Sequence, residues 1–291
     1  MPLSALLLIV LAALIHASWN LIAKQAAHVG PSFVFAFTLL GSVLYLPWVL
    51  WDIAHTTVTW TLPIVVCIVL SGLIHLAYSL CLQHGYRVAD LSVVYPVARG
   101  TGPLWSSMGA FLFLAEKPTT WGLIGIALVV IGIFLITTQG DWQKFRRSSA
   151  VPGVQWGLLT GLLIASYTVV DAYGVKTLLI TPVILDWCAN AVRFALLAPW
   201  VVKQERTLWQ SMRGHWHLAL AVSVLAPLSY ILVLFALRLG APVSLAAPAR
   251  EMSMMVGALL GMLVLGEAVT RWRLVGCALL LGGVILLGSA Q

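Results

Sequence analysis

The stretch LFLAEKPTTWGLIGIALVVIGIFLI covers residues 112–136, and MLVLGEAVTRWRLVGCALLLGGVILL covers residues 262–287. Both stretches pass through a short polar segment into a long apolar run that is interrupted mainly by glycine. A helix that crosses the hydrocarbon core of a bilayer needs about 20 mainly apolar residues. Each stretch therefore predicts a membrane-spanning helix, and the likeness between them indicates an internal duplication.

The composition of the whole chain agrees with a membrane protein. Of 291 residues, 61% are hydrophobic and only 9% are charged, and the mean hydropathy is +1.01. An ordinary globular chain carries roughly 25% charged residues, so this chain lacks the side chains to cover a soluble surface. The composition excludes a soluble enzyme, a DNA-binding protein and a secreted disulfide scaffold. The net charge of +7 comes mostly from short loops, and we expect no nucleic-acid partner.

Ten apolar segments follow one another along the chain, and polar interruptions of some length occur only at about 139–152 and 202–214. Strands are excluded because a backbone in lipid must satisfy its own hydrogen bonds and the segments do not alternate as barrel strands do. We therefore predict an all-α integral membrane protein with ten transmembrane helices. Their expected ranges are 3–24, 32–51, 61–83, 91–114, 119–138, 153–176, 180–201, 215–238, 241–265 and 269–289.

The two halves of the chain repeat each other. Shifting the sequence by 152 and then by 151 residues superposes residue types that are uncommon in membrane segments: Tyr78 on Tyr230, Pro96 on Pro248, Arg99 on Arg250, Glu116 on Glu267 and Trp121 on Trp272. We predict a first five-helix repeat over 1–138, a polar linker over 139–152 and a second repeat over 153–291. An odd number of helices turns the second repeat upside down. Inverted repeats are typical of transporters whose substrate site lies near mid-membrane.

Ionisable side chains within a membrane span are costly and by default mark a functional site. Six arginine and acidic side chains lie well inside the predicted helices, away from their ends: Arg99, Arg193, Arg250, Asp171, Asp186 and Glu251. Arg99 and Arg250 follow prolines near mid-span, where a loosened helix and a guanidinium would suit a carboxylate or phosphate. Glu251 could neutralise Arg250, bind an ammonium group or take up a proton. A purely structural bridge between the halves is an equally good interpretation.

Aromatic and hydrogen-bonding side chains recur at helical spacing on several segments, which would suit an amphipathic organic ligand if they converge. A packed and satisfied side chain is the alternative for each of them. On the helix at 180–201, Asp186, Asn190 and Arg193 form one face, so a local network there is as good an interpretation as a substrate contact. The predicted substrate-binding residues are Trp19, Asn20, Tyr78, Tyr95, Arg99, Tyr167, Tyr230, Arg250 and Glu251, and the candidate proton carriers are His16, His75, Asp171 and Glu251.

Other features are interpreted as structural or are absent. Glu116 and Glu267 directly precede the fifth and tenth predicted helices, where a carboxylate is favoured by the helix dipole. The four cysteines lack metal-ligand spacing, so we expect no metal and no cofactor. The sequence contains no GxxxxGK[ST], HExxH or GxSxG, which argues against direct ATP drive and against an enzyme.

The two quoted stretches resemble the closing signature of the EamA-type domain, which defines a large branch of the drug/metabolite transporter superfamily. The resemblance covers nearly the whole chain as two tandem domains. It implies a ten-helix carrier with a central cavity lined mainly by the first, third, fourth, sixth, eighth and ninth helices. Members mostly export amino acids and other small metabolites, and some import choline or sugars. Ala115–Glu116 departs from the usual Gly-Glu pair, and the stretch HASWN at 16–20 resembles one subgroup.

Together these observations predict a secondary active transporter that exports a small zwitterionic or amphipathic metabolite, such as an amino acid or a derivative of one, by alternating access. An importer or exchanger of choline-like cations or sugars is the alternative, and a membrane scaffold or an intramembrane enzyme is the rival from another class. We expect a multi-pass protein of the inner or plasma membrane, monomeric or homodimeric, whose partners are its substrate and the lipid bilayer. Basic residues are concentrated in the odd-numbered loops, which puts both termini outside, whereas the resemblance puts them inside.

Overall fold

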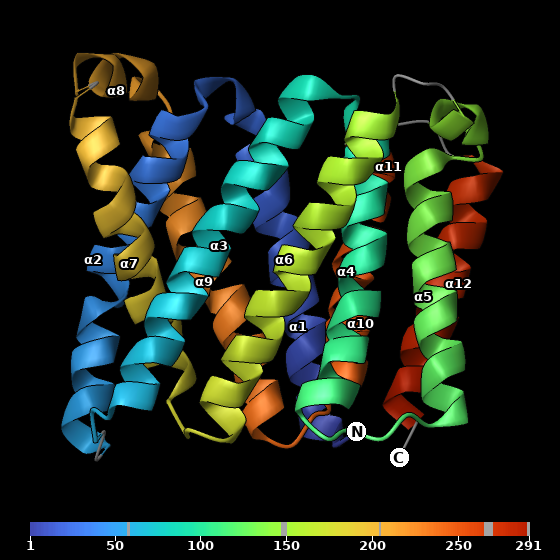
Figure 1. Ribbon diagram of the computed structural model, residues 1–291. Helices are drawn as coiled ribbons and strands as arrows, with labels where there is room; N and C mark the ends of the chain where they lie inside the picture. Colours follow the sequence, from blue (N-terminus) through green and yellow to red (C-terminus); the bar gives the residue numbers. More distant parts are fainter. Residues whose placement is uncertain (57–58, 147–149, 204, 265–269, 290–291) are drawn as a thin grey trace.

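The protein is a bundle of helices in the computed structural model, which describes residues 1–291 except 57–58, 147–149, 204, 265–269 and 290–291 (Figure 1). The described residues contain no strand, and the predicted all-α membrane class is confirmed. The helices are α1 (Leu3–Gln25), α2 (Pro31–His55), α3 (Leu62–Val88), α4 (Leu91–Phe113), α5 (Thr120–Thr138), α6 (Val151–Lys176), α7 (Pro182–Val202), α8 (Glu205–Met212), α9 (Trp216–Arg238), α10 (Val243–Arg250), α11 (Met252–Val264) and α12 (Arg271–Ser289). Short 3-10 helices lie at Ala27–Val29 and Trp142–Arg146.

The ninth predicted helix is divided at Glu251 into α10 and α11. Proline has no N–H, so Pro248 leaves the carbonyl of Ser244 without its helical donor. Ser107 Oγ of α4 lies 3.0 Å from that carbonyl oxygen and supplies a hydrogen bond instead.

The short helix α8 was not predicted, because it lies in the polar interruption between two spans. It covers the end of the bundle away from the termini (Figure 1).

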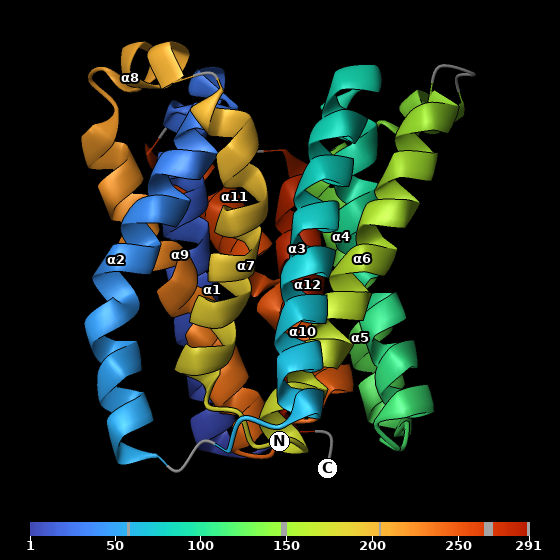
Figure 2. The ribbon, with the colours of Figure 1, turned by 60° about the vertical axis from the view of Figure 1, so that its left-hand side comes forward.

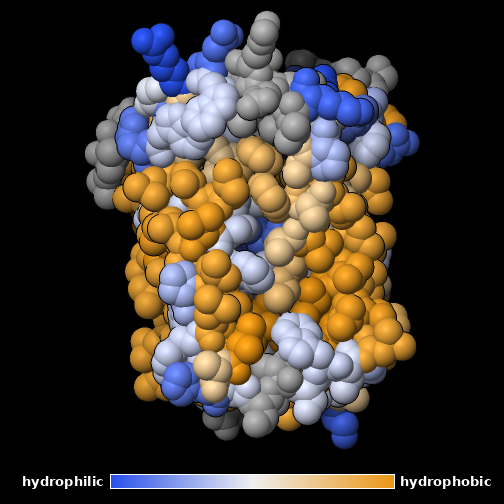
Figure 3. All heavy atoms as spheres, turned by 90° about the vertical axis from the view of Figure 1, so that its left-hand side faces the viewer, coloured by the Kyte–Doolittle hydropathy of each residue, from blue (hydrophilic) through white to orange (hydrophobic). Residues whose placement is uncertain are grey.

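Seven helices in the described part of the chain are long and apolar enough to cross a membrane. They are α1, α2, α3, α5, α6, α9 and α12. The three further predicted spans are those that carry most of the polar groups: α4 holds Arg99, α7 holds Asp186 and Arg193, and the ninth segment is split beside Glu251. Large apolar side chains cover the outside of the bundle, where Figure 3 shows an orange belt between more hydrophilic ends. This is the surface expected of a protein in lipid.

Helices α5 and α12 pack along a seam of glycines. A methyl group at Gly132 would lie 2.7 Å from the oxygen of Gly276, and one at Gly283 would lie 2.8 Å from the oxygen of Gly125. Residue numbers rise along one helix where they fall along the other, so α5 and α12 are antiparallel. Because Gly125 and Gly276 are repeat mates, as are Gly132 and Gly283, the seam is self-complementary in the manner of a two-fold contact.

The other helix contacts occur in matching pairs as well. Helix α1 packs on α9 as α3 packs on α6, and α2 packs on α9 as α3 packs on α7. In Figure 1, α1 begins at the end that holds both termini, whereas α6 begins at the opposite end. The two halves of the chain are therefore antiparallel to each other and enclose the centre of the bundle between them.

Candidate functional site

A cavity of about 410 Å³ lies in the half of the bundle away from the two termini. It is lined by eight helices, which are α1, α2, α3, α4, α6, α7, α9 and α10; the resemblance did not lead us to expect α2 and α7 among them. Figure 3 shows the hollow on the side of the molecule, with hydrophilic atoms at its base within the apolar belt. Figure 2 shows α7 and α3 beside each other, and both helices contribute residues to the lining of the cavity. A polar chamber in the apolar belt is the setting of a carrier's substrate site.

Most of the predicted site residues line this cavity. They are His16, Trp19, Asn20, His75, Tyr78, Tyr95, Arg99, Tyr167, Tyr230 and Arg250. Glu251 and Asp171 do not line it; each is 1% exposed and lies behind its wall. Sequence reasoning omitted several lining residues, including Phe37 and Thr38 of α2, Tyr86 of α3 and Thr160 of α6. Nothing in their local sequence distinguishes them from packed side chains, because only the arrangement of helices brings them together.

An aromatic cluster forms one wall of the cavity around His75 of α3. The ring of His75 stacks on Tyr167 with centroids 4.0 Å apart, and Tyr230 and Tyr78 each approach this pair edge-on. The ring nitrogen Nδ1 of His75 lies 3.0 Å from the carbonyl oxygen of Ser71, which holds the imidazole in place. Aromatic faces at this spacing suit the apolar body of an organic molecule or a cation.

Helix α1 lines the opposite part of the cavity. Trp19 Nε1 donates a hydrogen bond to Ser229 Oγ of α9 at 3.3 Å, and the ring of His16 packs against Trp19 at 4.8 Å between centroids. The amide of Asn20 donates back to the carbonyl of His16 at 2.8 Å. One face of α1 thus presents a fixed indole and a histidine, while part of the Asn20 side chain is already engaged by its own helix.

Two guanidinium groups share one buried carboxylate at the junction of the halves. Arg99 Nη2 lies 2.9 Å from Glu251 Oε2, and Arg250 Nε lies 3.9 Å from Glu251 Oε1. The N–H groups of Arg99 do not point at that oxygen, so the contact is an ion pair without a hydrogen bond. With two cations and one anion the cluster keeps a net positive charge, and Arg99 and Arg250 both face the cavity. The predicted bridge between the halves is therefore present, and both of its arginines also line the cavity.

Asp171 of α6 forms a second buried centre behind the aromatic wall. The hydroxyl of Tyr230 donates to Asp171 Oδ2, and His75 Nε2 lies 4.0 Å from the same oxygen. Ser71 of α3 also faces this carboxylate. No lysine or arginine among the described residues forms an ion pair with it. Asp171 is thus connected to the cavity through two side chains that line the cavity themselves.

The polar face of α7 is both a local network and part of the cavity lining, which joins the two interpretations weighed from sequence. Arg193 Nη2 donates to Asn190 Oδ1 at 2.9 Å, and Asn190 Nδ2 donates to Ser42 Oγ of α2 at 2.9 Å. Asp186, Asn190 and Arg193 all line the cavity.

In the described part of the chain, no cluster of three or more histidine, cysteine or acidic residues could hold a metal ion.

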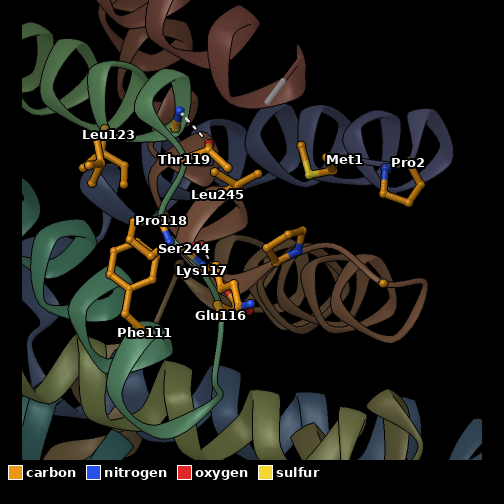
Figure 4. Close-up of a pocket in the computed structure, with 14 residues that line it drawn as sticks. Met1, Pro2, Phe111, Glu116, Lys117, Pro118, Thr119, Leu123, Ser244 and Leu245 are labelled. Atoms are coloured by element: carbon orange, nitrogen blue, oxygen red, sulfur yellow. Dashed lines mark hydrogen bonds between the residues drawn. The ribbon is translucent and has the colours of Figure 1, made fainter. Parts of the chain in front are cut away.

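Figure 4 shows a second cavity of about 470 Å³ at the end of the bundle that holds the termini. Glu116 lies in it, and its carboxylate does not cap α5, the helix that it precedes. Thr119 caps α5 by accepting from Gly122 N at 3.1 Å, while Glu116 accepts from Val243 N at 2.6 Å and Ser244 N at 2.9 Å. The carboxylate therefore satisfies the free N–H groups of α10, a helix of the other half. Its repeat mate Glu267 lies outside the described residues.

Lys176 completes this contact between the halves. Its ammonium group lies 3.5 Å from Glu116 Oε1 and donates to the carbonyl of Ala241 at 2.9 Å. We name the contact of Glu116 with Lys176, Val243 and Ser244 the Glu116 clasp. It joins the segment between α4 and α5 to α6 and α10, at the end of the bundle that holds the termini.

These features define a helical membrane carrier: antiparallel halves, an apolar outer belt and a polar chamber between the halves. The family model described as EamA-like transporter family matches the chain twice, over residues 3–138 and 151–289. The chain belongs to the EamA-like transporter family, as two tandem domains. Members of this family are transporters, not enzymes.

A solved structure described as "Crystal structure of protein" has the same fold. It superposes with a TM-score of 0.73 and 18% sequence identity, and the match covers 98% of each chain. No curated protein matches the sequence.

Proposed function

We propose that the protein is a secondary active transporter that exports a small zwitterionic or amphipathic metabolite, such as an amino acid or an amino-acid derivative. The observation that carries this proposal is the meeting of Arg99 and Arg250, from corresponding places in the two halves, in one aromatic-lined cavity of about 410 Å³. A guanidinium in a partly desolvated site binds a carboxylate strongly and with defined geometry. Trp19, Tyr78 and Tyr167 would surround the remainder of the molecule.

In the membrane we place ten spans, with α10 and α11 forming one broken span, and two five-helix repeats over 1–138 and 153–291 joined by the linker at 139–152. The three spans of lower hydropathy carry polar residues because their inner faces line a water-filled chamber. A membrane helix tolerates polar side chains where they face such a chamber. We propose a location in the inner or plasma membrane. No energy source other than an ion gradient or exchange is required by this scheme.

Alternating access would follow from rocking of one half against the other. In the structure the central cavity extends away from the termini, and the Glu116 clasp together with buried apolar residues holds the halves together at the terminal end. Opening the terminal end requires the clasp to separate. We assign proton coupling to the buried groups around the cavity, His16, His75, Asp171 and Glu251, with Asp171 in the position best linked to the lining.

The site is tested by transport into proteoliposomes that contain the purified chain. We expect Arg250→Gln and Arg99→Gln each to lower the rate of transport at least tenfold, because each removes a charge-assisted contact with the substrate. Arg238→Gln is the matched control, since Arg238 is exposed at the end of α9. Wild-type rates in both cavity variants would show that the assigned site is wrong.

The aromatic wall favours one alternative, a carrier of choline-like cations that would use Tyr78, Tyr167 and Tyr230 as a cage. Three guanidinium groups in the same cavity weigh against it, because a cation would meet like charge. Thermal-shift measurements with amino acids, quaternary amines and sugars separate these candidates. Stabilisation by a quaternary amine alone would favour the cation carrier.

A further inference from the structure

The α7 wall of the cavity holds a carboxylate that forms no ion pair with Arg99 or Arg250. Asp186 lines the cavity near the start of α7. Within the described part of the chain, its carboxylate forms no hydrogen bond and no ion pair shorter than 4.0 Å, although donors surround the cavity. An acidic group in this position is available to a ligand, because burial against a ligand cation would satisfy it.

The cation on the same helix is held elsewhere. Arg193 donates to Asn190, and Asn190 is fixed to α2 by its bonds to Ser42 Oγ at 2.9 Å and to the carbonyl of Thr38 at 3.3 Å. This chain of contacts directs the guanidinium of Arg193 along α7 toward α2. Arg193 thus lies close enough to Asp186 to act on its carboxylate through space, but it forms no ion pair with it.

The charges around the cavity separate into two poles. On the α6 and α7 side, Asp171 and Asp186 outnumber Arg193 by one negative charge; on the α4 and α10 side, Arg99 and Arg250 outnumber Glu251 by one positive charge. The whole set is neutral. A zwitterion would pair with both poles, whereas a plain anion or a plain cation would leave one pole unpaired and desolvated.

From this arrangement we infer that Asp186 binds the ammonium group of the substrate while Arg250 binds its carboxylate. The inference rests on the proposed function and names the two contacts that select the substrate. The sequence had offered Glu251 for the ammonium group, but Glu251 lies behind the cavity wall and is already paired with Arg99 at 2.9 Å. The His75–Tyr167 stack lines the same cavity and would contact the rest of the substrate.

The experiment measures efflux from proteoliposomes loaded with one of three mixtures: the standard amino acids, the matching primary amines without the carboxylate, and the matching carboxylic acids without the amine. We expect the wild type to release amino acids faster than either analogue mixture. Asp186→Asn should lower amino-acid efflux about tenfold and abolish the preference over carboxylic acids, since the variant no longer distinguishes an ammonium group. Arg250→Gln should instead abolish the preference over amines.

Two further variants separate recognition from folding. Asp186→Glu keeps the charge and should keep the order of the three mixtures. Asp90→Asn removes a carboxylate that is exposed and makes no side-chain cap to α4, so it should behave as the wild type. The melting temperature in detergent shows that each variant is folded.

The outcomes distinguish this inference from the proposed function. A wild type that releases none of the three mixtures overturns the proposed function, and with it the pairing of poles. If the wild type releases amino acids, and Asp186→Asn releases them at the same rate and with the same order of preference, the inference is overturned but the proposed function is not. The inference is supported if Asp186→Asn loses the preference for amino acids over carboxylic acids and Asp186→Glu retains that preference.

Discussion

At the scale of single residues, Asp171 couples a buried charge to the cavity. Its carboxylate is 1% exposed and contacts Tyr230 and His75, and both of these side chains line the central cavity. Arg193 and Arg250 lie near enough to act on it through space, and a bound zwitterion would change the field of both. A carboxylate placed in this way can exchange its proton in step with substrate binding.

Replacement of Asp171 by asparagine tests this coupling. The amide still offers an oxygen to Tyr230, but it cannot carry a proton. We expect proteoliposomes with Asp171→Asn to lose uphill transport driven by a pH gradient while they keep exchange of internal for external substrate. If the variant keeps uphill transport equal to that of the wild type, Asp171 is not the coupling residue, and His16, His75 or Glu251 would take that role. Asp90→Asn serves as the control for loss of a carboxylate, because Asp90 is exposed and does not line the cavity.

At the scale of helices, the glycine seam between α5 and α12 sets how closely the halves approach. Gly282 and Gly283 are neighbours on α12 but have opposite surroundings: a methyl group at Gly283 would lie 2.8 Å from the oxygen of Gly125, and one at Gly282 would meet nothing within 4 Å. The pair therefore separates the effect of packing from the effect of helix propensity. Close helix contact through small residues is a main source of stability between helices in lipid.

We expect Gly283→Ala to lower the thermal unfolding temperature in detergent, because the backbone of Gly125 must move away by several tenths of an ångström and the seam loses contact. A cost of about 1–3 kcal/mol is expected. Gly282→Ala should leave the protein as stable or raise its stability by up to about 1 kcal/mol, since alanine favours a helix. Equal melting temperatures for the two variants would contradict the role given to the seam.

The sequence located the seven long apolar helices closely, because a helix that crosses a bilayer must be long and apolar. It also located Pro248 as the place where the ninth segment is loosened. Which side of a broken helix faces the cavity could not be read from sequence, because the turn at Glu251 sets the rotation of α11 relative to α10. Glu251 therefore lies behind the wall although Arg250 faces the chamber. Likewise, Glu116 caps a distant helix that only the fold brings near.

At the scale of the whole molecule, the Glu116 clasp holds the halves together on the terminal side. Glu116→Ala removes the acceptor for Val243, Ser244 and Lys176, so we expect it to shift the population toward states open at that end. The readout is alkylation of a cysteine placed at Leu245, which lines the terminal cavity, in a chain whose native cysteines are serine.

Labelling should be about tenfold faster in Glu116→Ala, within the usual range of coupling free energies. Lys117→Ala is the control, since Lys117 borders the same cavity but is exposed. Unchanged labelling in the Glu116 variant would mean that the clasp does not hold this end closed.

The glycine seam has one more consequence. Gly125 and Gly132 meet the counterparts of each other, so the surface that α5 offers is the surface that α12 offers in return. A polypeptide of half this length, inserted in the membrane in both orientations, would form this self-complementary helix contact with an inverted copy of itself. Joining two such copies in a single gene would allow each half to diverge in sequence.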